Sequence, residues 1–237
     1  MLRATMVVTL LVLAGCGSAE QNTQDKSEPQ AAAPSKVGAC AVDSAAVTGA
    51  KTVATVDLDG DGSGEKVKLT APGGECGNTL FAELGDGYVS ISLESDAPPV
   101  MSAFTVAPAG DGGQLLVTRG NHPRGGYQLR VYAATAKELK ELTVDGQPLL
   151  PFVATDVQEH PWSIDCSDDG LVFTEAVPHE PPGVAAAWDI KQTTYAVDGG
   201  SVSKGTTEEI ADNVLPKDLS TKYPDLVKHS AFESCRA

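Results

Sequence analysis

The chain has 237 residues, with 32 Asp and Glu against 17 Lys and Arg, and a formal net charge of −15 at pH 7. Nucleic acids and anionic membrane surfaces are bound by clustered lysines and arginines, so this charge argues against both as partners. Hydrophobic residues make up 41% of the chain and the mean hydropathy is −0.10, which provides enough apolar side chains for a folded core. The length suits one domain or two small ones.

The N-terminus has the pattern of an export signal. Arg3 precedes an apolar run over residues 6–13, which is shorter than the ~20 residues of a membrane-spanning helix. Small residues follow the run directly before Cys16. The pattern predicts a signal peptide over residues 1–15, and an ordinary cleaved signal followed by a chance cysteine is the alternative.

The tetrad Leu13-Ala14-Gly15-Cys16 resembles the lipobox of bacterial lipoproteins. In that family the cysteine thiol is diacylated and the chain is cleaved before the cysteine. The resemblance implies that Cys16 carries acyl chains such as palmitate and anchors the protein to the extracytoplasmic face of the bacterial cell membrane. Residues 17–36 contain no aromatic residue and no Leu, Ile or Val, so we expect residues 16–36 to form the lipidated cysteine and a disordered tether.

Four cysteines remain once Cys16 is assigned to lipid. An even number in an exported chain favours two disulfides, with three connectivities open. We favour the pairs Cys40–Cys76 and Cys166–Cys235, because the first ties the start of the folded region to an early loop and the second holds the C-terminal segment. The sequence contains no CxxC motif or Cys/His cluster that would favour zinc or redox chemistry.

Alternation of apolar and polar residues predicts short strands from about residue 37 onward. The clearest alternating runs are 66–70, 88–93 and 127–132. Further strands are expected at 80–84, 139–144, 171–174, 187–190 and 195–197. Helical signal is limited to a turn over 135–139 and a short helix that begins at Pro216. The chain is therefore predicted to be mainly β.

An aspartate- and glycine-rich turn followed by a strand that ends in threonine occurs three times. The turns lie at 57–62, 107–112 and 165–170, and the closing residues are Thr70, Thr118 and Thr174. A further loop and further strands follow each threonine, so we expect a single domain over 37–237. It would hold three antiparallel four-stranded units, at about 50–100, 101–155 and 160–210, and a C-terminal tail.

Units of this size resemble the blades of a β-propeller, but three blades are too few for an ordinary closed propeller. A partial propeller, a compact three-sheet body and a β-sandwich therefore all remain open. Asp-Gly hairpin turns that recur through composition alone would give the same pattern.

The first turn has the spacing of a calcium-binding loop. Its oxygen ligands would be the side chains of Asp57, Asp59, Asp61 and Glu65 and the backbone carbonyl of Ser63. An EF-hand would need a glutamate at the twelfth position, where this chain has Lys68. The loop is similar instead to the shorter calcium loops of FG-GAP and VCBS-type repeats, and this resemblance implies one structural Ca²⁺. The alternative is an acidic, solvated turn without metal.

The other two turns lack this set of ligands. The second has Ala107 and Ala109 at two ligand positions. The third keeps Asp165, Ser167 and Asp169 but has no counterpart of Glu65. We therefore expect a single calcium site that contributes to stability.

The sequence carries no catalytic motif. His122, His160 and His179 lie in loops that contain proline, and none of them belongs to an HExxH or Ser/His/Asp pattern. The leading interpretation is a non-catalytic binding or accessory protein of the cell envelope, with an envelope protein or a polysaccharide as its partner.

Two alternative functions have their own tests. An envelope hydrolase would bring two of the three loop histidines and an acid within ~3–4 Å of one another. A polysaccharide-binding module would place Trp162 and Trp188 in one groove. The one basic concentration of the sequence, Arg119, His122 and Arg124 beside Tyr127, is a candidate contact for an acidic or sugar partner.

Overall fold

The computed structural model describes residues 36–94, 99–107, 114–123, 125–135, 138–153, 160–167, 170–179, 187–198 and 200–235, which all belong to one compact unit. The predicted signal peptide, Cys16 and the tether up to residue 35 lie outside the described residues, as do Ala109, Arg124 and Asp169. No helix among the described residues is long and apolar enough to cross a membrane.

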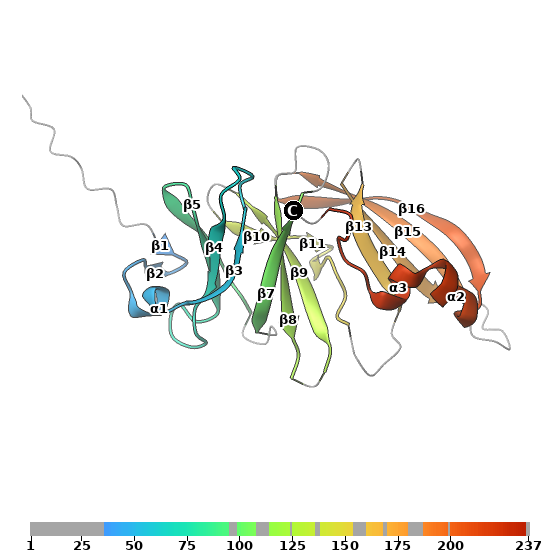
Figure 1. Cartoon of the computed structure of the whole chain (residues 1–237), viewed down its shortest axis with the longest axis horizontal. Coiled ribbons are helices and arrows are strands. Elements are labelled where there is room, and N and C mark those ends of the chain that lie inside the picture. The colour runs from blue at the N-terminus through green and yellow to red at the C-terminus, as the bar shows by residue number, and fades with distance from the viewer. Residues whose placement is uncertain are drawn as a thin grey trace, which may run out of the picture. The chain divides into compact units, whose positions relative to one another are not determined.

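Three antiparallel sheets of four strands form the body of the protein (Figure 1). The first sheet contains β3 (Lys51–Val56), β4 (Glu65–Leu69), β5 (Thr79–Leu84) and β6 (Gly87–Ser92). The second contains β7 (Val100–Val106), β8 (Leu115–Asn121), β9 (Tyr127–Ala134) and β10 (Leu139–Glu141). The third contains β13 (Trp162–Ser167), β14 (Gly170–Pro178), β15 (Trp188–Asp198) and β16 (Ser201–Val214). Within each sheet the strands are neighbours in chain order, which confirms the predicted mainly β fold of antiparallel four-stranded units.

Short elements precede, link and follow the three sheets. A hairpin of β1 (Lys36–Val37) and β2 (Cys40–Ala41) leads into α1 (Ala45–Thr48), and we call these elements the N-terminal cap. A second small hairpin pairs β11 (Thr143–Val144) with β12 (Gln147–Pro148). The C-terminal cap comprises α2 (Pro216–Lys222), α3 (Pro224–Lys228) and residues 229–235. α2 begins at Pro216 as predicted, because proline lacks only an N–H that is unpaired at a helix start.

Alternation along the strands places each sheet between two apolar layers. On β8, Leu115 and Val117 pack toward the third sheet, whereas Leu116 packs toward the first. On β5, Leu80 faces the second sheet and Phe81 faces the N-terminal cap. The second sheet is therefore buried on both faces.

The two end sheets each turn an outer face toward a cap. Val37 and Val47 of the N-terminal cap pack on the first sheet. Leu219 and Leu226 of the C-terminal cap pack on the third, beside Ile190. Terminal layers of this kind cover apolar surface that would otherwise face water.

Four strands of the three sheets were not predicted: β3, β7 and β13, each the first strand of its sheet, and β16, the last strand of the third sheet. Residues 195–197, expected to form a separate strand, continue β15, and β16 supplies the remaining strand. β16 is an edge strand with mostly exposed side chains, so its sequence has no regular apolar alternation. Residues 139–144, expected as one strand, divide between β10 and β11.

Two disulfides join the favoured pairs of cysteines. Cys40 and Cys76 have Cα atoms 5.8 Å apart, and Cys166 and Cys235 have Cα atoms 5.9 Å apart. The first bond ties the N-terminal cap to the connection between β4 and β5. The second ties the end of the C-terminal cap to β13. Each bond therefore fixes one cap to one end sheet.

Candidate metal centre

The predicted calcium loop connects β3 to β4. Val56 and Glu65 form the last register pair of the hairpin, and Leu58 is buried between the first two sheets. Gly62, at the sixth position of the loop, has φ +88°, a backbone conformation in which a side chain would be strained. The buried leucine and the strand pairing fix the base of the loop, while Asp59 and Asp61 remain exposed.

Three carboxylates converge on this loop. Asp57, Asp59 and Asp61 each place an oxygen within 4.8 Å of the others. The Gly60 and Gly62 amides donate to the two Asp57 oxygens at 2.7 and 2.9 Å. The Ser63 amide donates to Asp61 Oδ1 at 2.7 Å. These bonds hold the carboxylates over the turn, where they can share one cation.

Glu65 has a different place from the one that the spacing suggests. Its Oε2 accepts a hydrogen bond from the Leu58 amide at 2.7 Å, which closes the base of the loop. It does not belong to the cluster of three aspartates. Three of the predicted ligands, the carboxylates of Asp57, Asp59 and Asp61, therefore lie close together. Glu65 and the Ser63 amide instead form hydrogen bonds within the loop.

Gln114 is a neighbour of the loop that the sequence did not indicate. Its Cγ and Nε2 lie 4.0 Å from the position that a Cβ on Gly60 would occupy. Its Oε1 is buried and has no hydrogen-bond partner among the described residues. Gln114 precedes β8 in the second sheet, so only the packing of two sheets places this amide beside the loop.

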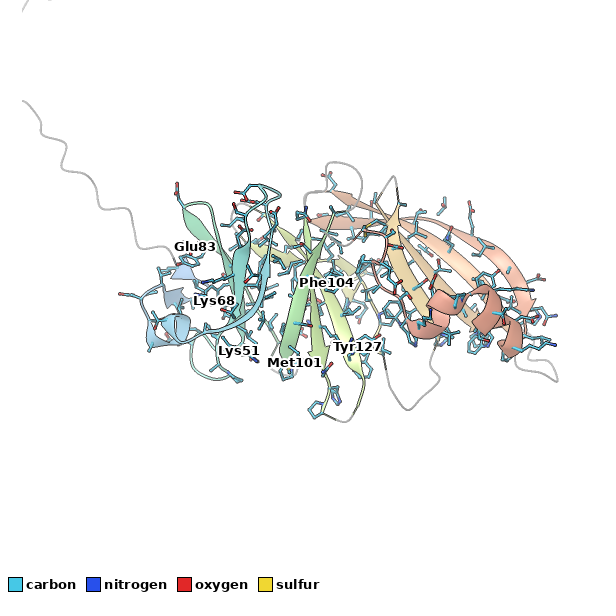
Figure 2. The ribbon with its side chains drawn as sticks, viewed as in Figure 1. Lys51, Lys68, Glu83, Met101, Phe104 and Tyr127 are labelled. Atoms are coloured by element: carbon cyan, nitrogen blue, oxygen red, sulfur yellow. A yellow bond between two sulfur atoms is a disulfide. The ribbon has the colours of Figure 1, made fainter. Side chains whose placement is uncertain are left out.

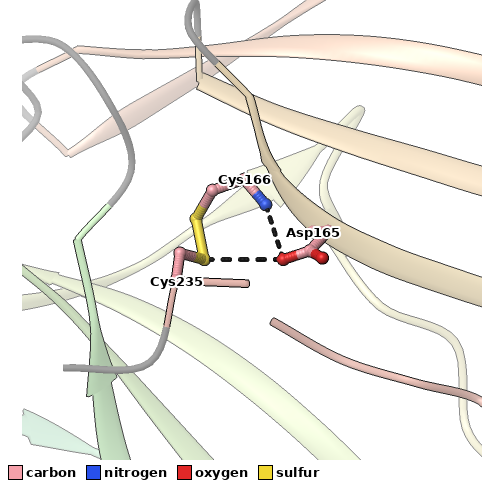
Figure 3. Close-up of side chains that lie close together, drawn as sticks. All are labelled: Asp165, Cys166 and Cys235. Carbon is pink, nitrogen blue, oxygen red and sulfur yellow. Dashed lines mark hydrogen bonds between the residues drawn. A yellow bond between two sulfur atoms is a disulfide. The ribbon is translucent and has the colours of Figure 1, made fainter. Parts of the chain in front are cut away.

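Asp165, the first aspartate of the third predicted turn, lies in β13 and has a structural role. Asp165 Oδ1 accepts hydrogen bonds from the Cys166 amide at 3.0 Å, the Ser234 amide at 3.1 Å and the Ser234 hydroxyl at 2.6 Å. Figure 3 shows this carboxylate beside the Cys166–Cys235 disulfide. Both cysteine sulfurs are used in the disulfide, so this group of side chains does not offer thiolates to a metal.

The histidines occupy separate environments. His179 Nδ1 lies 2.7 Å from Asp189 Oδ1, which also accepts from the Asn213 amide at 3.0 Å. The Asn213 amide and then the His179 ring hold the pKa of Asp189 below its usual value. His122 packs edge-on against Phe152. The clusters of metal-ligating side chains found in the described part of the chain include no histidine.

The two tryptophans lie on opposite faces of the third sheet. Trp162 is buried between the second and third sheets, where it stacks on Phe173. Trp188 packs on the outer face beside the C-terminal cap. Trp162 and Trp188 therefore do not share the groove by which the polysaccharide-binding alternative was to be tested.

In the basic segment at the ends of β8 and β9, Arg119 contacts Tyr127. The Arg119 guanidinium lies 4.0 Å from the centre of the Tyr127 ring, a cation–π contact. Burial raises the pKa of the Tyr127 hydroxyl, and the Arg119 charge partly offsets this. Tyr127 also exchanges two backbone hydrogen bonds with Val153, so the ring that Arg119 covers is held firmly.

Comparison of the chain with protein-family models, curated proteins and solved structures gives no match.

Proposed function

We propose that this protein is a lipid-anchored, non-catalytic binding protein of the bacterial cell envelope whose β-rich body is stabilised by one calcium ion. The observation that carries this proposal is the convergence of the Asp57, Asp59 and Asp61 carboxylates on a loop fixed at its base. The lipobox-like tetrad 13–16 supports the anchor, and the two disulfides suit an oxidising compartment.

Calcium chemistry accounts for the crowding of these carboxylates. Three negative charges on one turn repel one another, and a divalent cation removes that cost. Calcium accepts six to eight oxygen ligands at about 2.3–2.6 Å in flexible geometry, so backbone carbonyls and water can complete the shell. Weak extracellular sites are filled at the ~1 mM calcium found outside cells.

The experiment is a thermal melt of the folded domain in calcium and in chelator. Calcium at tenfold to hundredfold above Kd adds about 1.4–2.7 kcal/mol to the free energy of unfolding. For a domain of this size that corresponds to a Tm increase of about 3–10 °C. Magnesium should give a smaller shift, because it demands octahedral geometry and retains its waters.

A matched pair of variants decides whether the shift comes from this loop. Asp59→Ala with Asp61→Ala should abolish the calcium shift. Glu208→Ala with Glu209→Ala removes the same charge from exposed positions on β16 and should leave the shift intact. A calcium shift that survives in the first variant, or is absent in the unaltered protein, rules out this site.

The anchor is tested separately in cells. Cys16→Ser should abolish incorporation of labelled palmitate and leave residues 1–15 uncleaved. Equal labelling and equal cleavage of the two forms would contradict the lipid anchor and leave the calcium proposal untouched.

A further inference from the structure

A groove of about 470 Å³ lies on the outer face of the first sheet, directly beside the aspartate loop. Its floor consists of β4 and β5 side chains that alternate away from the second sheet: Lys66, Lys68, Phe81 and Glu83. Figure 2 labels Lys68 and Glu83, which point to the side of the sheet where the N-terminal cap lies. The volume falls within the ~300–1,000 Å³ of small-ligand sites.

The groove contains two lysine side chains that form no salt bridge with the described residues. Lys66 is exposed and Lys68 is half-buried. The two side chains are two residues apart on one strand, so they lie on the same face about 6–7 Å apart along it. On a chain with a net charge of −15, such a pair is suited to the anionic groups of a ligand.

An aromatic ring forms another part of the lining. Tyr88 is half-buried, and its ring is tilted against Phe81 with the two ring centroids 6.1 Å apart. This packing fixes the orientation of the tyrosine ring in the groove. An aromatic face with polar groups around it offers apolar surface to a sugar ring and hydrogen bonds to its hydroxyls.

The calcium loop forms one edge of the same groove. Asp59, Asp61 and Glu65 line it, and Glu83 adds a fourth acid, so the lysines are outnumbered when no cation is bound. An anionic ligand is then repelled. A calcium ion on Asp59 and Asp61 adds two positive charges at this edge and accepts further oxygen ligands from whatever lies in the groove.

We propose that the groove binds a polysaccharide that carries carboxylates, of the uronic acid class, with calcium as a bridge; the calcium part rests on the proposed function. A uronate ring supplies both kinds of group that the groove receives. Its carboxylate and hydroxyl oxygens suit calcium and the Lys66 and Lys68 ammonium groups, and its apolar ring face suits Tyr88. Electrostatics makes binding depend on calcium, and linkage requires the saccharide to strengthen calcium binding by the same factor.

The experiment is titration calorimetry of the full chain, carrying Cys16→Ser to prevent acylation, with trigalacturonate and with the neutral maltotriose. We expect trigalacturonate to bind in calcium at least tenfold more tightly than in chelator, and maltotriose not to bind. Lys66→Gln with Lys68→Gln should weaken trigalacturonate binding at least tenfold without reducing the calcium Tm shift, because two charges that repel the ion are removed. Lys217→Gln with Lys228→Gln, at exposed positions on the C-terminal cap, is the matched control and should bind as the unaltered protein does.

Each outcome separates this inference from the proposed function. A calcium Tm shift without trigalacturonate binding overturns the groove proposal and leaves the calcium loop standing. Binding that is equal in calcium and chelator, equal for maltotriose, or unaffected by the lysine substitutions also overturns it. Loss of the calcium shift itself removes the proposed function first, and the calcium bridge with it.

Discussion

The outer faces of the first and third sheets share an architecture but differ in their basic side chains. Each is partly covered by a cap that a disulfide holds, and each leaves a groove open beside the cap. The first groove contains Lys66, Lys68 and Tyr88. The third, of about 580 Å³, is lined by hydroxyl, amide and acidic side chains such as Thr174, Gln192 and Asp225, and no lysine or arginine belongs to its described lining.

The aspartates of the two end sheets also differ in the groups that donate hydrogen bonds to them. In the third sheet, Asp165 accepts hydrogen bonds from the Ser234 amide and hydroxyl, which hold the C-terminal turn in place. In the first sheet, the hydrogen bonds described for Asp57, Asp59 and Asp61 come from the loop's own amides. The same local motif thus serves tertiary structure at one end and leaves carboxylates exposed at the other.

The largest effects should come from cutting the disulfide of either cap. The bonds close sequence separations of 36 and 69 residues, and chain entropy assigns each about 4 kcal/mol. We expect Cys40→Ala with Cys76→Ala and Cys166→Ala with Cys235→Ala to lower the free energy of unfolding in urea by about this amount, with all chains carrying Cys16→Ser.

The second disulfide variant should lose more of the core. Phe232, two residues before Ser234 in the C-terminal cap, is fully buried between the second and third sheets beside Phe104. The N-terminal cap packs only on the outer face of the first sheet. Limited proteolysis should therefore release the N-terminal cap locally in the first variant but cleave several sites in the second. Identical cleavage patterns would contradict this difference.

Effects of intermediate size are expected for Asp165→Ala and Asp59→Ala, and only the second should depend on calcium. Asp165→Ala removes hydrogen bonds to a charged acceptor and should cost about 1–2 kcal/mol in calcium and in chelator alike. Asp59→Ala relieves repulsion, so it should be neutral or stabilising in chelator and destabilising relative to the parent only in calcium. Urea unfolding of both variants in both buffers measures this. A calcium-dependent cost for Asp165→Ala would make the third turn a second ion site.

The fold was predictable where burial left a regular pattern. Residues 66–70, 88–93 and 127–132 alternate between apolar and polar side chains, and β4, β6 and β9 lie there. β16 escaped prediction because an exposed edge strand does not need apolar residues at every second position. The repeat of the aspartate turn indicated three four-stranded sheets, but it carried no information about the caps that cover the end sheets.

The candidate site was predictable only in its local part. The spacing of Asp57, Asp59 and Asp61 within one turn determines that their side chains can converge. The spacing of residues left no such signal for the pairing of strands or the packing of sheets. Gln114 lies beside the loop because two sheets pack together, and Lys66 and Tyr88 share a groove because β4 and β6 both pair with β5.

The smallest predicted effect is a dependence of stability on pH, and it arises in the C-terminal cap. His229 ends α3 with φ +52° and packs against the buried Trp162 ring, with the two centroids 5.5 Å apart. Burial lowers the pKa of His229, so the folded state favours the neutral ring. The unfolded chain therefore binds more protons, and the stability from His229 is present above pH ~6.5 and is lost as pH falls below it.

His229→Asn tests this, because asparagine tolerates the left-handed backbone and does not titrate. Between pH 7 and pH 5 we expect the Tm of the unaltered protein to fall about 1–3 °C more than that of the variant. His160→Asn, at an exposed position, is the control and should keep the parent's pH dependence. Parallel pH profiles for the parent and His229→Asn would show that the C-terminal cap does not sense protons through this ring. The two caps would then differ in packing alone.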